Sequence, residues 1–385
     1  MRRLLVVVLG LAVLMAGAAR AADPGAGSKT MVTGYLAPNF RIIDKGETYV
    51  PDTLNPGSGT WVQNASDMGF GMAFNRVTFS GEMEAGKIVK NVAWSVEVDV
   101  SHPTEVALQW AYIQPKFNDV LSVRFGHVKK PFSREVLHAT GKLLTVDRTP
   151  ATRELIDLGY ANYNFGLEAV VAQPMFKITA GAYSGSPSEK SVPDQDPGLD
   201  FGGRAVVMPM DGVEIGVNAI LVTLYEDGNN DGVYSDKVES NSGMAFGFDV
   251  DYKKDFGTME LWAQAELGMG DNWEEGAKEP AAMDTWKDYS WYKFQYYYLK
   301  ALFMVNADLG IHFGYSAWDP NTDADAGKNN SISVITPGIT YFWAKNLRTQ
   351  AEVQLRTEQQ GVDGDGANLD NLTYTHFVLQ TVLIW

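Results

Sequence analysis

The chain contains no cysteine, and this absence excludes several classes of protein. Without cysteine there is no disulfide framework, no thiolate chemistry and no lipid-anchored N-terminal cysteine. Histidine is almost as scarce, because only five are scattered along 385 residues, without the spacing of metal ligands. The sequence also lacks a Gly-x-Ser-x-Gly motif, a nucleotide-binding loop and a nucleic-acid-binding patch. It therefore does not indicate an enzyme.

Long apolar runs are absent beyond the N-terminus. The chain begins with the basic residues Arg2 and Arg3, continues with an apolar run over residues 4–18, and then reads Ala19-Arg20-Ala21. This order is typical of a secretory signal peptide. We expect residues 1–21 to be removed on export and residues 22–385 to form the mature domain. An N-terminal membrane helix is the alternative, although the run is short for one.

Basic residues are few, 31 against 47 acidic ones, and the net charge is −16. Loss of residues 1–21 removes three arginines, so the mature charge is −16 − 3 = −19. Residues 124–153 invert this balance, with seven cations against two anions, or about +5. Such a local excess concentrates anions around it. The seven cations are Arg124, Lys129, Lys130, Arg134, Lys142, Arg148 and Arg153.

Apolar and polar residues alternate with a period of two in many segments. Between residues 346 and 358, one set of alternate positions is apolar or small and the other is entirely polar. This pattern predicts a β-strand, whose polar face would point outward in a soluble sandwich and inward in a membrane barrel. We predict sixteen strands, near residues 30–43, 68–83, 89–101, 104–117, 120–128, 162–173, 175–184, 200–209, 212–226, 242–254, 257–270, 291–305, 307–318, 331–344, 346–359 and 372–385.

Short turns and long, acidic loops alternate between these strands. A barrel of the bacterial outer membrane predicts this alternation, with turns at the periplasm and loops outside. The last residues, 377–385, alternate and end on an aromatic residue that would lie at the membrane interface. We expect the aromatic run at 291–298 at an interface too, with sugar contact as the alternative. The sequence thus predicts an all-β, antiparallel transmembrane β-barrel. A soluble secreted β-protein that binds polysaccharide remains the alternative.

Five short motifs occur in the order of a known family. They are residues 74–81, the run 126–135 (Gly-His-Val-Lys-Lys-Pro-Phe-Ser-Arg-Glu), and residues 163–166, 182–185 and 203–209. Over residues 70–210 the chain resembles the phosphate-selective porin O/P family. The resemblance implies a porin of sixteen strands, usually a homotrimer in outer-membrane lipid, that passes small anions such as phosphate.

The resemblance also implies that the third long loop, residues 129–161, folds into the lumen. Within it, Thr149 followed by Pro150 predicts the start of a short helix and Gly159 its end. The candidate pore residues are Arg76, Arg124, Lys129, Lys130, Arg134, Lys142, Arg148, Arg153 and Arg204. Arginine and lysine there would bind anions that lose part of their hydration. Alternatively, the barrel-wall acids Glu97, Asp99, Glu260 and Glu266 neutralise these cations, which would give a general, weakly selective porin.

One acidic segment has the spacing of a calcium loop. Asp227, Asn229 and Asp231 alternate before Gly232, and Asp236 follows. Alternate oxygen ligands and a glycine suit Ca²⁺, but Val238 occupies the position of the bidentate glutamate of an EF-hand. We therefore expect either a structural calcium in an outer loop or a solvated turn, and no other cofactor.

Overall fold

The computed structural model describes residues 29–44, 47–51, 59–63, 67–101, 106–185, 198–225, 240–272, 292–322, 331–359 and 371–385. The predicted signal peptide, residues 1–21, lies outside these ranges. So do Asp227, Asn229, Asp231 and Asp236 of the candidate calcium loop.

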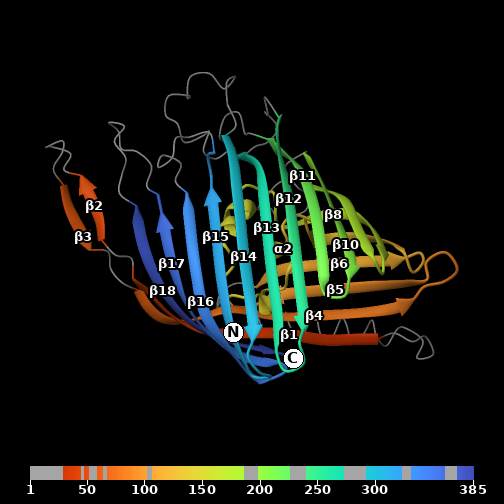
Figure 1. Ribbon diagram of the computed structural model, residues 1–385. Helices are drawn as coiled ribbons and strands as arrows, with labels where there is room; N and C mark the ends of the chain where they lie inside the picture. Colours follow the sequence, from red (N-terminus) through yellow and green to blue (C-terminus); the bar gives the residue numbers. More distant parts are fainter. Residues whose placement is uncertain are drawn as a thin grey trace.

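Sixteen antiparallel strands form one closed barrel (Figure 1). The strands are β1 (Lys29–Asp44), β4 (Asp67–Glu84), β5 (Asn91–Asp99), β6 (Ala107–Lys116), β7 (Leu121–Lys129), β8 (Tyr163–Gln173), β9 (Phe176–Ser184), β10 (Leu199–Met210), β11 (Val213–Tyr225), β12 (Ser240–Asp255), β13 (Glu260–Asn272), β14 (Tyr292–Met304), β15 (Leu309–Asp319), β16 (Ile332–Ala344), β17 (Leu347–Glu358) and β18 (Leu372–Ile384). Each pairs with its neighbours in sequence order, and β1 closes the ring against β18. The predicted number and order of strands are confirmed.

A separate hairpin joins β1 to β4. Its strands, β2 (Glu47–Pro51) and β3 (Gly59–Gln63), pair only with each other. The sequence did not predict them, because five residues are too few for an alternation to stand out within the loop expected at 44–67. Within the described ranges, no helix is long and apolar enough to cross a membrane.

The strands have their polar faces inside and their apolar faces outside. On β17, Gln350 and Glu352 are each 1% exposed, whereas Leu355, on the other face, is 42% exposed. Elsewhere on the outer surface lie Phe125, Phe248 and other large apolar side chains. This is the polarity of a barrel surrounded by lipid and not of a soluble sandwich. The alternation predicted either a soluble sandwich or a membrane barrel, and the structure has the polarity of the membrane barrel.

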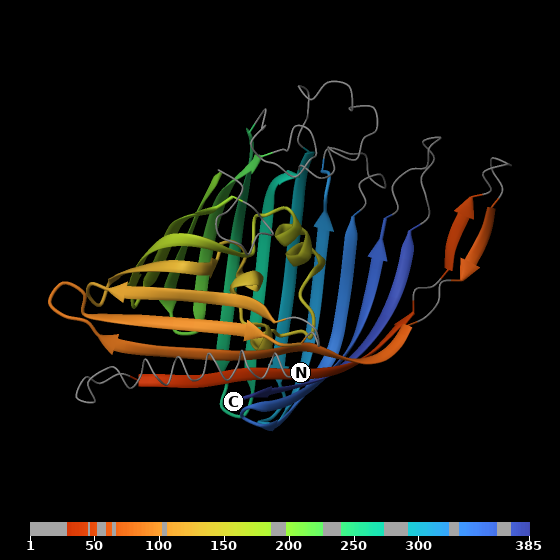
Figure 2. The same cartoon turned by 180° about the vertical axis from the view of Figure 1, so that it is seen from behind.

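The chain between β7 and β8 lies inside the ring of strands (Figures 1 and 2, yellow). We call residues 130–162 the inner loop. It contains the short helix α2 (Arg134–Leu137), a 3-10 turn (Thr140–Lys142) and the helix α3 (Pro150–Asp157). As predicted, Thr149 precedes α3, Pro150 starts it, and Gly159 follows its end in the left-handed region, at φ 76°.

Apolar packing fixes one side of the inner loop to the wall. Buried loop side chains, including Phe132, Leu155 and Tyr160, form one cluster with buried wall residues. The wall contributes Ile220, Val222, Ala245, Phe294, Tyr296 and Trp318. The predicted interface position of the 291–298 aromatics is thus wrong for Phe294, Tyr296 and Tyr298, because strand alternation turns them into the lumen. Tyr297, on the opposite face, does point outward.

Candidate pore constriction

A buried arginine ties helix α2 to the adjacent strands β11 and β12. Arg134 bonds to Glu214 on β11 at 2.6 Å, and to Asp249 at 3.1 Å and Asp251 at 3.0 Å on β12. Burial lowers the pKa of Arg134, but the charges of Asp251 and its neighbours outweigh this, and its pKa is raised. The arginine therefore stays charged and holds the start of the inner loop at the wall.

A buried glutamate joins α2 to α3 and to β14. Glu135 accepts hydrogen bonds from the Thr149 amide at 2.9 Å, from its hydroxyl at 2.6 Å, and from Thr152 at 2.5 Å. It also pairs with Lys300. Burial alone would raise the pKa of Glu135, but Lys300 and these donors hold it below its usual value. The Thr149 hydroxyl thus donates to Glu135 and does not cap a backbone amide of its own helix.

Further contacts attach the rest of the inner loop to strands around the ring. Lys130 and Asp200 of β10 form a fully buried ion pair. The amide of Val146 donates to Glu352 of β17 at 2.8 Å, and Asp147 accepts from Arg41 of β1. Because β1, β10–β14 and β17 all make such contacts, the loop is held from several directions.

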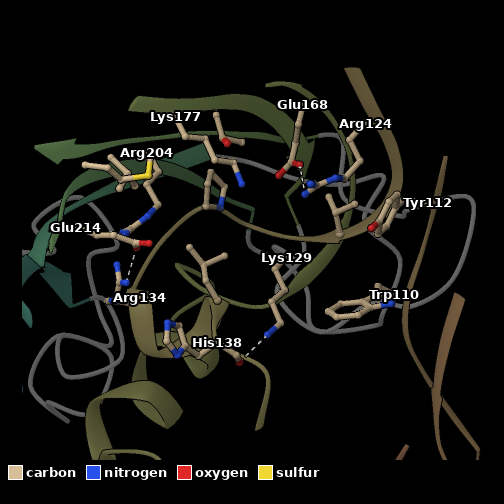
Figure 3. A pocket seen from close by; sticks show the side chains of 16 residues that line it. Trp110, Tyr112, Arg124, Lys129, Arg134, His138, Glu168, Lys177, Arg204 and Glu214 are labelled. Atoms are coloured by element: carbon tan, nitrogen blue, oxygen red, sulfur yellow. Dashed lines mark hydrogen bonds and ion pairs between the residues drawn. The ribbon is translucent and has the colours of Figure 1, made fainter. Parts of the chain in front are cut away.

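A cavity of about 430 Å³ remains between the loop and strands β6–β11 (Figure 3). Five cations and two acids line it, together with several aromatic and aliphatic side chains. The charged residues are Arg124, Lys129, Arg134, Lys177, Arg204, Glu168 and Glu214. The cavity wall is therefore positively charged, in a chain whose total charge is negative.

Three of the five cations have carboxylate partners. Arg124 bonds to Glu168 at 2.9 Å, and Arg204 binds both oxygens of Asp249, at 2.6 and 2.7 Å. Arg134 shares that aspartate. These pairs orient the arginines and offset part of their charge.

The two lysines have no ion-pair partner among the described residues. Lys129 donates to the carbonyl oxygens of Val136 and His138, at 2.6 and 3.2 Å, and its ammonium lies 5.9 Å from the Trp110 ring centre. Among the described residues, neither Lys129 nor Lys177 forms an ion pair with a carboxylate. Figure 3 shows both around the cavity. Lys177 is exposed, whereas Lys129 is buried and its ammonium already donates to two carbonyl oxygens.

The structure brings four of the nine candidate residues together at this cavity: Arg124, Lys129, Arg134 and Arg204. Arg76 lies beside it and pairs with Asp99 at 2.9 Å and Glu97 at 3.6 Å. Lys130 does not line the cavity, because Asp200 and the Gly159 carbonyl enclose its ammonium.

The other three candidates lie elsewhere. Lys142 borders a separate cavity of about 790 Å³ near the short turns. Arg148 donates within the loop, to the His138 carbonyl at 3.1 Å. Arg153 is 86% exposed on α3 and 3.8 Å from Asp157.

Sequence reasoning overlooked Lys177, which alternates on β9 with the outward residues Phe176 and Ile178; that alternation could have revealed it.

The expected neutralisation by wall acids is partly present, since Glu97 and Asp99 hold Arg76. Glu260 pairs instead with Lys253, and Glu266 accepts from Ser133. In the described part of the chain, no three His, Asp or Glu residues are placed to hold a metal ion.

A closed sixteen-stranded barrel with a polar lumen and a loop across it defines the class of outer-membrane porins, proteins of the bacterial outer membrane. Residues 61–242 match the model of the phosphate-selective porin O and P family. The resemblance indicated by the sequence motifs is thereby confirmed.

Solved structures share the fold at low sequence identity. An anion-selective porin from Comamonas acidovorans aligns with a TM-score of 0.63 and 11% identity, over 93% of this chain and 100% of that one. A loop-deletion mutant of OmpT, an outer membrane protein of Vibrio cholerae, gives 0.60 and 10%, over 93% and 99%. OprB of Pseudomonas putida gives 0.59 and 11%, over 93% and 94%. No curated protein sequence matches the chain.

Proposed function

We propose that this porin is a passive channel selective for small anions, including phosphate, and that it is not an enzyme. The observation that carries the proposal is the cavity between the inner loop and β6–β11, with five cations against two acids in its lining. The description of the matching family as phosphate-selective supports it, as does the fold similarity to an anion-selective porin.

The chemistry of the cavity suits an anion in transit. A permeating ion exchanges part of its hydration shell for donors on the wall, and must bind weakly enough to leave again. Arg124 and Arg204 offer planar guanidinium donors, while Lys129 and Lys177 act as point charges. Because carboxylates already hold the arginines, the field attracts an anion without trapping it.

A weakly selective general porin is the second candidate, and the same ion pairs favour it. If Glu168, Glu214, Asp249 and Asp251 offset most of the positive charge, the cavity would discriminate little between ions. The basic, apolar and small-residue order of residues 1–21 supports a signal peptide there and a mature domain over residues 22–385, and the family resemblance supports a homotrimer. A calcium ion at Asp227, Asn229, Asp231 and Asp236 is proposed from their spacing alone.

The reversal potential of the purified porin in a planar bilayer, under a KCl gradient, tests selectivity. We expect an anion-signed potential, and a fall in chloride current when inorganic phosphate is added. The double variant Lys129→Glu/Lys177→Glu should move the potential to the cation sign, because it changes the charge of the lining by four units. Arg153→Glu, on the same loop but outside the cavity lining, is the matched control and should have little effect. A cation-signed potential in the unaltered protein would overturn the proposal.

A further inference from the structure

Much of the lining of the cationic cavity is apolar, which an inorganic ion does not need. Beside the charged groups it contains two aromatic residues of β6 and several aliphatic side chains. These are Trp110, Tyr112, Val128, Pro131, Leu137, Val206 and Met208. Wall strands and the inner loop both contribute, so the apolar surface faces the cavity from more than one side.

The aromatic residues lie beside the cations. The Arg124 guanidinium carbon is 5.0 Å from the centre of the Tyr112 ring, and the Lys129 ammonium is 5.9 Å from that of Trp110. The Trp110 indole N–H already donates to Ser95 at 3.1 Å, which fixes the orientation of the ring. A group that reaches either cation therefore meets an aromatic ring within a few ångströms, and beside Lys129 the orientation of that ring is fixed.

In its size, and in offering apolar surface beside polar groups, the cavity resembles sites for small organic molecules. Such sites have volumes of about 300–1,000 Å³ and a mainly apolar lining, with few polar groups that fix orientation. The cavity, at about 430 Å³, is within that range. A bare inorganic anion would use the cations and leave the apolar surface in contact with water.

We propose that the cavity is a binding site for organic anions with an apolar body, such as an aromatic carboxylate, and that it binds them more tightly than small hydrophilic anions of the same charge. The carboxylate lies near one of the two cations without a carboxylate partner among the described residues, Lys177 or Lys129. The ring lies against the apolar side chain on the same side of the cavity, Met208 for Lys177 or Trp110 for Lys129. The site rests on the proposed anion channel and specifies its substrate class.

Block of the chloride current by benzoate and by acetate tests this directly, because both carry one carboxylate and only benzoate carries a ring. Single-channel current is measured in a planar bilayer as each sodium salt is added. We expect benzoate to reach half-block at about a tenfold lower concentration than acetate, since partial burial of an aromatic ring contributes about that factor. Equal half-blocking concentrations in an anion-selective channel would overturn the inference and leave the proposed function intact.

Two variants locate the site. Trp110→Gln and, separately, Met208→Gln should raise the half-blocking concentration of benzoate towards that of acetate. Met304→Gln makes the same chemical change in the other cavity and should leave the ratio as it is. Retention of the faster migration of the unboiled barrel on gels shows that each variant is folded. If both cavity variants keep the benzoate preference, benzoate does not bind in this cavity and the inference is wrong. A cation-selective unaltered channel would overturn the proposed function itself.

Discussion

The two sides of the inner loop differ in what they contact and in what they leave open. On one side an apolar cluster and buried pairs such as Glu135–Lys300 join the loop to strands from the upper part of β11 to β17. On the other side, facing β6–β11, cations and aromatics line an open cavity. The closed side uses charge to hold the loop, whereas the open side keeps two cations without carboxylate partners among the described residues. Two lysines therefore have different roles: Lys300 attaches the loop to the wall, whereas Lys177 faces the cavity and can contact solutes.

Replacing the buried Glu135 removes a contact that holds the loop to the wall on the closed side. Of the changes considered, this one should lower the free energy of unfolding most. Glu135→Ala leaves Lys300 buried without its carboxylate, and the loss of one partner from a buried pair costs about 3–5 kcal/mol. We expect a lower free energy of unfolding in denaturant and a larger, noisier single-channel current. The double variant Glu135→Leu/Lys300→Met should recover much of the stability. If Glu135→Ala unfolds like the unaltered protein, the pair does not hold the loop.

A large-to-small change in the apolar cluster tests the same side with no charge involved. Leu155 is fully buried where α3 meets the wall, so Leu155→Ala should cost about 2–5 kcal/mol through the cavity it creates. Denaturant unfolding followed by tryptophan fluorescence measures this. Reversal potential is the second readout, and it should change little. A large shift in selectivity would show that the two sides are not independent.

Most of the barrel could be predicted from the sequence, because strand alternation and turn length are local properties. The sixteen strands and the start of α3 at Thr149–Pro150 are examples. The local pattern could not reveal which cations would be neutralised. Arg134 and its partner Asp249 are 115 residues apart, and Lys130 and Asp200 are 70 apart. Only closure of the barrel brings these partners together. The sequence therefore revealed the basic segment but not which of its cations lack a carboxylate partner.

On the open side, Lys177→Gln should change selectivity without changing stability. Lys177 forms no ion pair with the described residues, so the free energy of unfolding should move by less than about 0.5 kcal/mol. The ratio of anion to cation permeability should fall. Reversal potential and denaturant unfolding are measured on the same preparation. A loss of stability comparable with that of Leu155→Ala would mean that Lys177 is structural.

The pH dependence of stability should carry a small contribution from His138, which borders the cavity. Burial, followed by the charge of Arg134, lowers its pKa to about 4, from an unfolded value of about 6.5. The unfolded chain thus binds the proton more readily, and stability falls as pH drops from about 6.5 towards 4. Relative to His138→Gln, the unaltered protein should lose stability only below pH 6.5. A difference that grows above pH 7 would contradict this sign.

The central claim is that the inner loop closes one side of the lumen and leaves the other open, and thiol labelling tests it most directly because the chain has no native cysteine. Thr179→Cys places a thiol at the open cavity, and Ser316→Cys places one on the buried wall of β15, which α3 contacts. A charged, water-soluble methanethiosulfonate reagent is added while single-channel current is recorded. The account predicts a stepwise loss of current in Thr179→Cys and none in Ser316→Cys. Equal modification of both positions would contradict it.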